Sequence, residues 1–205
     1  MIKSTSRIFS LSIQRSLQLH NPRAFTNAAR NLSEQQRFLL ARTINAPAAD
    51  VYDVVSNISD YKKFMKYCTE SVVTKKDEAT GRPTQAGLTV GFLHYDESLE
   101  CEVQCVQEKN GNYTVVANSL THSLFNALQT HWCIKPHPLR PSATEAVLCL
   151  EFQFKSSLYN NVASIFGKSA AEHVMKSFEK RIFSLKRQNA KNKAGDTAER
   201  ATLKN

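Results

Sequence analysis

The chain of 205 residues lacks long apolar runs. A helix that spans a bilayer needs about 20 consecutive apolar residues. The apolar stretches of this chain are much shorter, for example residues 147–150. Any contact with a membrane should therefore be peripheral. Once the two polar ends are set aside, the remaining chain suits a single domain with a sizeable core.

Acidic residues are missing from the first 33 positions, and the first of them is Glu34. The same stretch carries five basic side chains and six serines. This composition is typical of a mitochondrial transit peptide; a basic tail without function is the alternative. We predict that residues 1–33 are a transit peptide and that the mature protein starts near Ser33.

The basic excess is concentrated at the two ends of the chain. The net charge is +9; residues 1–33 hold five of these charges and residues 188–205 a further two. Residues 34–187 are therefore close to neutral, and they show short basic pairs such as Lys62–Lys63 rather than the basic stripe of a nucleic-acid-binding protein. Nucleic acid is a poor candidate for the partner.

Cysteine is present in an odd number, five, without paired spacing. This fits a reducing compartment better than a disulfide framework. Cys101 and Cys105 would lie about 13 Å apart along one strand, too far to chelate one metal ion. His131 and Cys133 would face the same way about 6.6 Å apart, but no second pair of ligands stands at a suitable spacing. We therefore predict no metal site.

Short catalytic motifs are also absent: the sequence has no glycine-rich phosphate loop, no Gly-x-Ser-x-Gly, no His-Glu-x-x-His and no Cys-x-x-Cys. The polar cluster at residues 94–97 is interpreted as a solvated turn and His122 as a cap of the short apolar segment that follows it. His173 is interpreted as a surface or satisfied core residue of the long helix, with a position facing the cavity as the alternative. No catalytic set is visible. A cyclase that used one or two polar groups in a cavity would escape this test.

The elements that the sequence does contain follow a specific order. Residues 38–44 form an expected strand, Pro47 starts a helix over residues 48–57, and Ser59 is an expected N-cap for a second short helix. Extended segments then follow at residues 67–76, 86–96, 97–108, 112–119, 129–136 and 144–156. They are separated by turn-type segments at residues 77–83, 109–112 and 136–141, and Asn110-Gly111 is the strongest hairpin signal.

The end of the domain has helical periodicity. Apolar residues advance by three or four positions from Leu158 to Leu185, which predicts an amphipathic helix of roughly 28 residues. Residues 188–205 are polar and are predicted to be disordered. We therefore predict an α+β fold of the helix-grip type, in which an antiparallel sheet wraps around a long C-terminal helix. The cleft between sheet and helix should take an apolar ligand.

Several segments together carry a resemblance to a known family. They are residues 42–47 (RTINAP), 61–68 (YKKFMKYC), 86–92 (AGLTVGF), 113–117 (YTVVA), 124–132 (LFNALQTHW), 136–138 (PHP) and 152–156 (FQFKS), with the helix around Phe166, Met175 and Phe178. In this order, over residues 34–187, the chain resembles the mitochondrial coenzyme Q-binding proteins of the START and polyketide-cyclase-like superfamily, and it looks closest to fungal members. The family usually has proline where this chain has Lys66, so the end of the second short helix should differ.

The resemblance implies a START-like domain that binds ubiquinone without catalysis and needs no cofactor. It also implies support of respiration and quinone biosynthesis, and peripheral association with the matrix side of the inner mitochondrial membrane. Quinone-biosynthetic proteins are possible partners. The expected ligand-binding residues are Tyr61, Phe64, Leu88, Phe92, Phe125, Leu128, Trp132, Phe152, Phe154, Phe166, Val174, Met175 and Phe178. Lys62, Lys63, Met65 and Lys66 are expected to dock on the membrane, although a solvated helix face explains them equally well.

Two other functions remain open at this point. One is a cyclase or aromatase on the same fold, because one fold hosts many activities. The other is a structural partner of a quinone-biosynthetic assembly whose cavity is incidental. A long polyprenyl tail exceeds a pocket of typical size, about 300–1,000 Å³. We therefore expect the ring and first isoprene units to enter, and the edge of the long helix beside residues 61–67 to open for them.

Overall fold

The computed structural model describes residues 35–92, 95–120, 123–156 and 160–202, with the side chains of residues 92, 95, 160–166 and 193–202 not described. The transit peptide expected at residues 1–33 lies outside this part of the chain. All of the described residues belong to one unit, residues 31–205.

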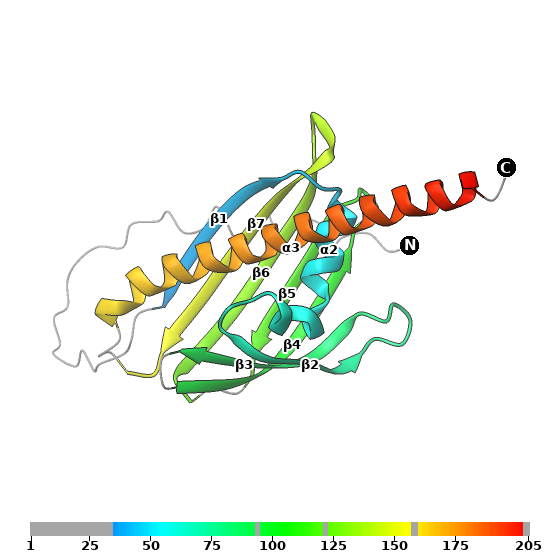
Figure 1. Cartoon of the computed structure of the whole chain (residues 1–205). Helices are drawn as coiled ribbons and strands as arrows, with labels where there is room; N and C mark the ends of the chain where they lie inside the picture. The colour runs from blue at the N-terminus through cyan, green and yellow to red at the C-terminus, as the bar shows by residue number, and fades with distance from the viewer. Residues whose placement is uncertain (1–34, 93–94, 121–122, 157–159, 203–205) are drawn as a thin grey trace, which may run out of the picture. The chain divides into compact units, whose positions relative to one another are not determined.

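Seven antiparallel strands form one sheet in the order β1-β7-β6-β5-β4-β3-β2 (Figure 1). Their bounds are β1 Gln36–Ile44, β2 Cys68–Lys76, β3 Pro83–Phe92, β4 Tyr95–Gln107, β5 Tyr113–Ser119, β6 Phe125–His137 and β7 Arg140–Phe154. Strands β2 to β7 form a meander, and β1 pairs with β7, with Gln36 opposite Phe152 and Ile44 opposite Thr144. The antiparallel sheet predicted from the sequence is confirmed.

The alternation of side chains along β7 gives the sheet one apolar face. Leu148, Phe152 and Phe154 are buried on it, because successive residues of a strand point to opposite faces. The turn before β5 also follows the prediction, since Gly111 adopts a φ of 82° that favours glycine. This geometry explains why Asn110-Gly111 is such a strong hairpin signal.

The strand β6 is longer than the sequence predicted. It begins at Phe125 instead of residue 129 and ends at His137, while β7 already begins at Arg140. Pro136 and Pro141, which were expected in a long turn, thus belong to strands. Proline lacks an N–H group and is tolerated where pairing is irregular, and the register shifts between Pro136 and His137.

Two short helices follow β1 as expected, and one expected cap is wrong. The helix α2 spans Ala48–Ser56 and starts after Pro47; η1 is a 3₁₀ helix over Ile58–Lys63. Ser59 was predicted as the N-cap, but it lies inside η1 and its hydroxyl donates to Oδ1 of Asn57 at 2.8 Å. Asn57 instead holds both the C-cap position of α2 and the N-cap position of η1.

The long helix α3 spans Asn160–Thr202 and lies across the apolar face of the sheet (Figure 1). Ala171, Met175, Phe178 and Ile182 are buried along it at helical spacing. Together with the sheet it confirms the predicted helix-grip arrangement. The predicted helix end near Arg187 and the disordered tail from residue 188 are wrong, because the helix continues to Thr202.

The extension of α3 has a simple physical cause. Residues 188–202 contain no proline and include four alanines and two lysines, which are good helix formers. Once a helix has nucleated, each added residue gains a hydrogen bond at little cost. The sequence analysis treated the loss of apolar residues as the end of the helix, although this loss marks only the end of packing.

Candidate ligand-binding site

The apolar core between α3 and the sheet is organised around the ring of Phe178. Its centroid lies 5.0 Å from Trp132 on β6, 5.0 Å from Tyr61 on η1 and 5.1 Å from Phe64, which follows η1. The Tyr61 and Phe64 rings meet Phe178 edge-on, a favourable aromatic geometry. Three segments far apart in the sequence thus share one buried aromatic cluster.

A second apolar cluster lies nearer the start of α3. The ring of Phe125 stacks on Phe154 at 4.9 Å, and Phe152 lies 5.3 Å from Phe154 and 5.9 Å from Phe38. Ala171 is the buried residue that α3 contributes to this cluster. Leu128 packs against both clusters and so links them into one continuous apolar interior.

All predicted pocket residues with described side chains fall in these two clusters. The cluster of Phe178 contains Tyr61, Phe64, Leu88, Leu128, Trp132, Val174 and Met175, and the second contains Phe125, Phe152 and Phe154. The side chains of Phe92 and Phe166 lie outside the described part, although their backbones belong to β3 and α3. The structure therefore brings the described set together around one interior; its contact with a ligand stays a prediction.

The interior around Phe178 is filled by rings instead of forming an open cleft. A pocket of about 140 Å³ lies beside it, lined by Asp53, Val54, Asn57, Asp60, Phe64, Arg181 and Leu185. Ligand pockets typically measure about 300–1,000 Å³. A ligand of that size could enter this region only if side chains or the segment over α3 moved outward.

That segment, residues 57–68, meets α3 along a seam that includes an ion pair and a ring contact. Asp60 pairs with Arg181 of α3 at 3.2 Å and with Lys63 at 2.6 Å, and the Lys63 hydrogen bond is the main reason that the pKa of Asp60 lies below its ordinary value. The ring of Tyr67 lies 5.2 Å from His173 of α3. Because these contacts involve partly exposed groups, they can separate at lower cost than the core.

The four residues predicted to dock on a membrane lie in or near this seam with different surroundings. Lys62 pairs with Glu70 at 2.9 Å, Lys63 pairs with Asp60 as described, and Lys66 places Nζ 5.3 Å from the Tyr67 ring centroid. Met65 packs against the core around Phe178. Two of the three lysines thus have their charge partly compensated within the protein.

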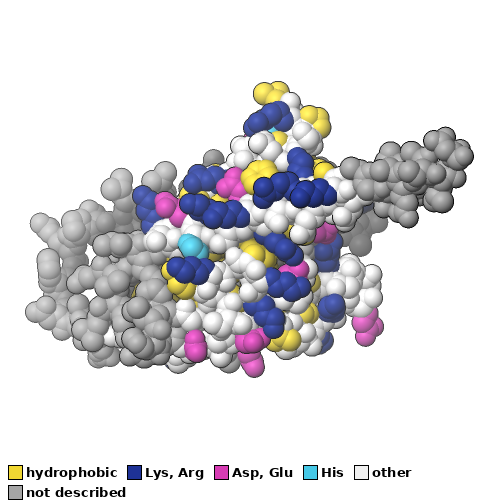
Figure 2. All heavy atoms as spheres, in the orientation of Figure 1, with side chains coloured by type: hydrophobic (Ala, Val, Ile, Leu, Met, Phe, Trp, Pro, Cys, Tyr) yellow, Lys and Arg dark blue, Asp and Glu magenta, His cyan; other side chains and the backbone are white. Residues whose placement is uncertain are grey.

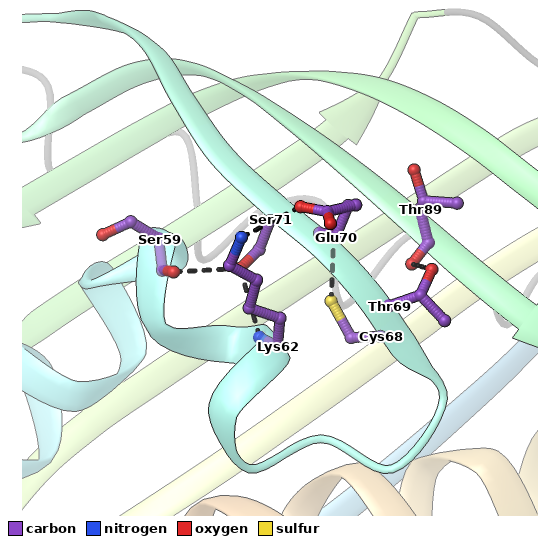
Figure 3. A network of polar contacts seen from close by, with 7 residues as sticks. All are labelled: Ser59, Lys62, Cys68, Thr69, Glu70, Ser71 and Thr89. Carbon is purple, nitrogen blue, oxygen red and sulfur yellow. Dashed lines mark hydrogen bonds and ion pairs between the residues drawn. The ribbon is translucent and has the colours of Figure 1, made fainter.

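Figure 3 shows how η1 is held to β2 beside these lysines. The backbone N–H of Lys62 donates to Oγ of Ser71 at 3.1 Å, and the Ser71 hydroxyl donates to the carbonyl of Ser59 at 3.0 Å. Ser71 is buried, so both bonds are shielded from water. The seam toward α3 is therefore the more readily opened side of η1.

The polar groups that reach the interior are uncharged at neutral pH. Burial raises the pKa of Tyr61 far above its ordinary value, and its hydroxyl donates to the carbonyl of Val55. Burial also raises the pKa of Cys101 and of Cys105 to about 11, so neither is a thiolate nucleophile. Among the described residues, no group of three or more His, Cys, Asp or Glu side chains is placed to hold a metal ion.

His131 and Cys133 face away from this interior. They flank Trp132, which points inward, and Nε2 of His131 lies 3.5 Å from Sγ of Cys133. Burial lowers the pKa of His131, in line with the half-buried position expected from the sequence. On the same face, Nε of Arg37 donates to Sγ of Cys149 at 3.3 Å. This polar cluster lies on the face of the sheet opposite the side chain of Trp132.

Two features were missed by the sequence analysis. Arg82, interpreted as a turn residue, donates to Asp53 and to Ser56 at 2.7 Å and lies 4.5 Å above the ring of Tyr52, so it fastens the β2–β3 turn to α2. Thr84 has a buried hydroxyl oxygen without a hydrogen-bond partner among the described residues. Arg82 lies 26 and 29 residues from its two partners. No local sequence pattern predicts either feature.

Within the described residues, no helix is both long and apolar enough to cross a membrane. This matches the short apolar runs of the sequence.

Comparison with solved structures places the fold among START-like domains. A START superfamily protein from Mycobacterium smegmatis superposes with a TM-score of 0.61 at 18% identity, over 73% of this chain and 98% of the other. The Zhui aromatase/cyclase from Streptomyces sp. R1128 gives a TM-score of 0.57 at 12% identity, over 73% and 94%. At these identities the likeness concerns the fold alone.

Comparison with sequences is more specific. Residues 44–179 match the family model described as polyketide cyclase/dehydrase and lipid transport. The mitochondrial coenzyme Q-binding protein COQ10 of Eremothecium gossypii is 48% identical over 156 residues, covering 76% of each chain. Its namesake in Saccharomyces cerevisiae is 45% identical over 153 residues, covering 75% of this chain and 73% of the other. The chain therefore belongs to the polyketide cyclase/dehydrase and lipid transport family, and within it to the group of the mitochondrial coenzyme Q-binding proteins.

Proposed function

We propose that this protein binds ubiquinone between α3 and the sheet and acts as its carrier or chaperone. The observation that carries the proposal is the 48% identity to a relative named as a coenzyme Q-binding protein. That identity extends over a domain whose interior is lined by two linked aromatic clusters. An apolar interior suits an isoprenoid quinone, since each buried methylene contributes about 0.8 kcal/mol.

The size of the ligand sets the manner of binding. A few isoprene units suffice for strong retention, whereas a whole long polyprenyl tail exceeds a typical pocket. The quinone ring and first isoprene units enter the interior, and the rest of the tail stays in lipid or in another protomer. The seam between residues 57–68 and α3 is the entrance, and the lysines at positions 62, 63 and 66 with Met65 meet the membrane beside it.

Binding without catalysis is the activity that the interior supports best. The groups that point inward, such as Tyr61 and Cys101, remain protonated because burial raises each pKa, and a general base needs a pKa near the working pH. The protein works in the mitochondrion after loss of residues 1–33, at the matrix side of the inner membrane. It supports respiratory electron transport and quinone biosynthesis there, with quinone-biosynthetic proteins as partners.

Lipid extraction of the purified protein tests this function. We expect ubiquinone to co-purify, and quinone added to emptied protein to quench the fluorescence of Trp132, whose ring lies in the core. Turnover of a quinone-ring precursor would instead indicate an enzyme. An empty interior together with stable protein partners would indicate a structural component of a biosynthetic assembly.

A further inference from the structure

The solvent side of α3 carries a line of basic side chains that the family resemblance does not explain. Side chains three or four positions apart on a helix lie on one face. The basic stripe of α3 is defined here by Lys176, Lys180, Phe183, Arg187 and Lys191. These residues lie on the side of the helix opposite Met175, Phe178 and Ile182, which are buried. The four cations are exposed, so their charges face water.

The stripe has little acidic compensation. Residues 167–192 contain seven basic side chains and two acidic ones, and within the described part of the chain no carboxylate forms an ion pair with a cation of the stripe. Figure 2 shows dark blue side chains gathered along α3 and continuing below it. A helix face that carries mainly positive charge raises the local concentration of anionic partners.

An aromatic ring interrupts this basic face. Phe183 is half-buried and packs into neither apolar cluster. It lines a shallow groove of about 800 Å³ together with Lys180, Lys186, Arg187 and Ala190. Water is a poor environment for the exposed part of this ring, and a nucleic-acid duplex would leave the ring unused because its bases are already paired and stacked. A bilayer surface accommodates both, since headgroups attract cations while the acyl boundary takes the ring.

We propose that the basic stripe docks α3 on the surface of an anionic bilayer, with the helix parallel to the surface and Phe183 inserted at the headgroup boundary. The inference rests on the proposed function, because transfer of a quinone is the reason for docking. It assigns the main docking surface to α3 and keeps the lysines at positions 62, 63 and 66 as a second contact. With α3 on the membrane, the Tyr67–His173 contact of the seam lies close to the lipid. A quinone can then pass between bilayer and interior without crossing water.

Vesicle binding by the full chain tests the docking surface. The variant Lys176→Glu, Lys180→Glu, Arg187→Glu is compared with Lys75→Glu, Lys76→Glu, Lys109→Glu, which changes the net charge equally at exposed sites away from α3. We use phosphatidylcholine vesicles with and without phosphatidylglycerol. Each basic residue near an anionic surface raises the membrane affinity about fivefold. The stripe variant should therefore bind the anionic vesicles at least about 100-fold more weakly. The control variant should keep most of its affinity.

A second measurement does not depend on charge reversal. In the Phe183→Trp variant, vesicles with brominated acyl chains should quench the fluorescence of the new tryptophan. The fluorescence of the buried Trp132 in the unaltered protein should not be quenched. Phe183→Ser should weaken binding with the charge unchanged. Circular dichroism confirms that each variant keeps its helix.

Three results would overturn the docking proposal: equal losses in both charge variants, affinity that does not depend on phosphatidylglycerol, or a stripe that binds duplex DNA but not vesicles. Ubiquinone content separates this inference from the proposed function. The stripe variant should retain its bound quinone, because none of its substitutions faces the interior. Quinone-free protein that still docks through α3 would contradict the function and leave the docking surface in place.

Discussion

At the residue scale, Trp132 is the side chain on which the sequence and the structure agree most closely. It belongs to the segment that carries the family resemblance, and it is 4% exposed and lies 5.0 Å from Phe178. His131 shares the segment and Cys133 directly follows it, but both face the other side of the sheet. Strand alternation thus separates a predicted ligand contact from two polar residues beside it.

We expect Trp132→Ala to reduce the amount of ubiquinone that co-purifies with the protein. Truncation of a buried tryptophan typically costs about 3–5 kcal/mol of stability, so thermal melting must be measured on the same sample. Quinone is then normalised to folded protein, and Trp132→Phe serves as the control that keeps a ring in place. Undiminished quinone per folded molecule in Trp132→Ala would mean that the residue only fills the core.

Thr84 offers a more local test. Its hydroxyl is buried without a partner among the described residues, and it shares a strand face with Ala86 and Leu88 of the core. Replacing an unpaired buried hydroxyl by a methyl group is nearly neutral or stabilising. We therefore expect Thr84→Val to keep or raise the melting temperature, yet to lower ubiquinone retention if the hydroxyl donates to a quinone carbonyl. Full retention would exclude that bond.

At the element scale, the start of α3 is held unusually close to the sheet. A Cβ at Gly167 would lie 2.2 Å from Cε2 of Phe38 and 2.8 Å from Cε1 of Phe152, well inside van der Waals contact. Glycine is therefore required by the approach of helix and strand, even though it weakens the helix itself. The same approach encloses the second aromatic cluster.

Gly167→Ala should destabilise the protein although alanine favours a helix by about 1 kcal/mol. The added methyl group must displace Phe38 or push α3 outward. We expect a lower urea midpoint, and partial rescue when Phe38→Ala removes the obstructing ring, measured as a double-mutant cycle. Ser169→Ala, at an exposed position two residues along α3, is the control. Purely additive effects of Gly167→Ala and Phe38→Ala would contradict the steric explanation.

At the scale of the whole molecule, one apolar interior coexists with two polar outer faces. The interior keeps its titratable groups uncharged, whereas the stripe of α3 and the cluster of Arg37, Cys149 and Glu151 remain outside. The near-neutral total charge of residues 34–187 conceals this uneven distribution. The interior therefore makes stability sensitive to pH on the alkaline side.

We expect the free energy of unfolding to fall as pH rises from about 9 to about 11. Burial raises the pKa of Cys101 and of Cys105 from 9.0 to about 11, so in this range the unfolded chain has released protons that the folded chain still holds, and the unfolded state is favoured. Urea midpoints at pH 7, 9 and 10 in the presence of a reductant measure the effect. Cys101→Ala with Cys105→Ala should flatten the dependence; an unchanged slope would assign it to other groups.

Local rules were enough to predict much of the fold. Alternation along residues 148–154, the spacing of apolar residues from Leu158 to Leu185 and the Asn110-Gly111 turn depend on neighbours in the chain, so the sequence alone predicted the meander, the long helix and the apolar ligand class. The prediction of the helix end failed for the same reason. Composition shows where the packing of a helix stops, whereas backbone hydrogen bonds decide where the helix itself stops.

Contacts between distant segments required the tertiary structure. Phe178 meets Trp132 and Tyr61, and Arg181 pairs with Asp60, only because the register of the sheet and the position of α3 bring these residues together. The same holds for the hydrogen bonds of Arg82 to α2 and for the close approach at Gly167. The sequence by itself determined which residues are apolar and in what period; the tertiary structure decided which of them meet, because side-chain contact depends on register and on the distance between packed layers.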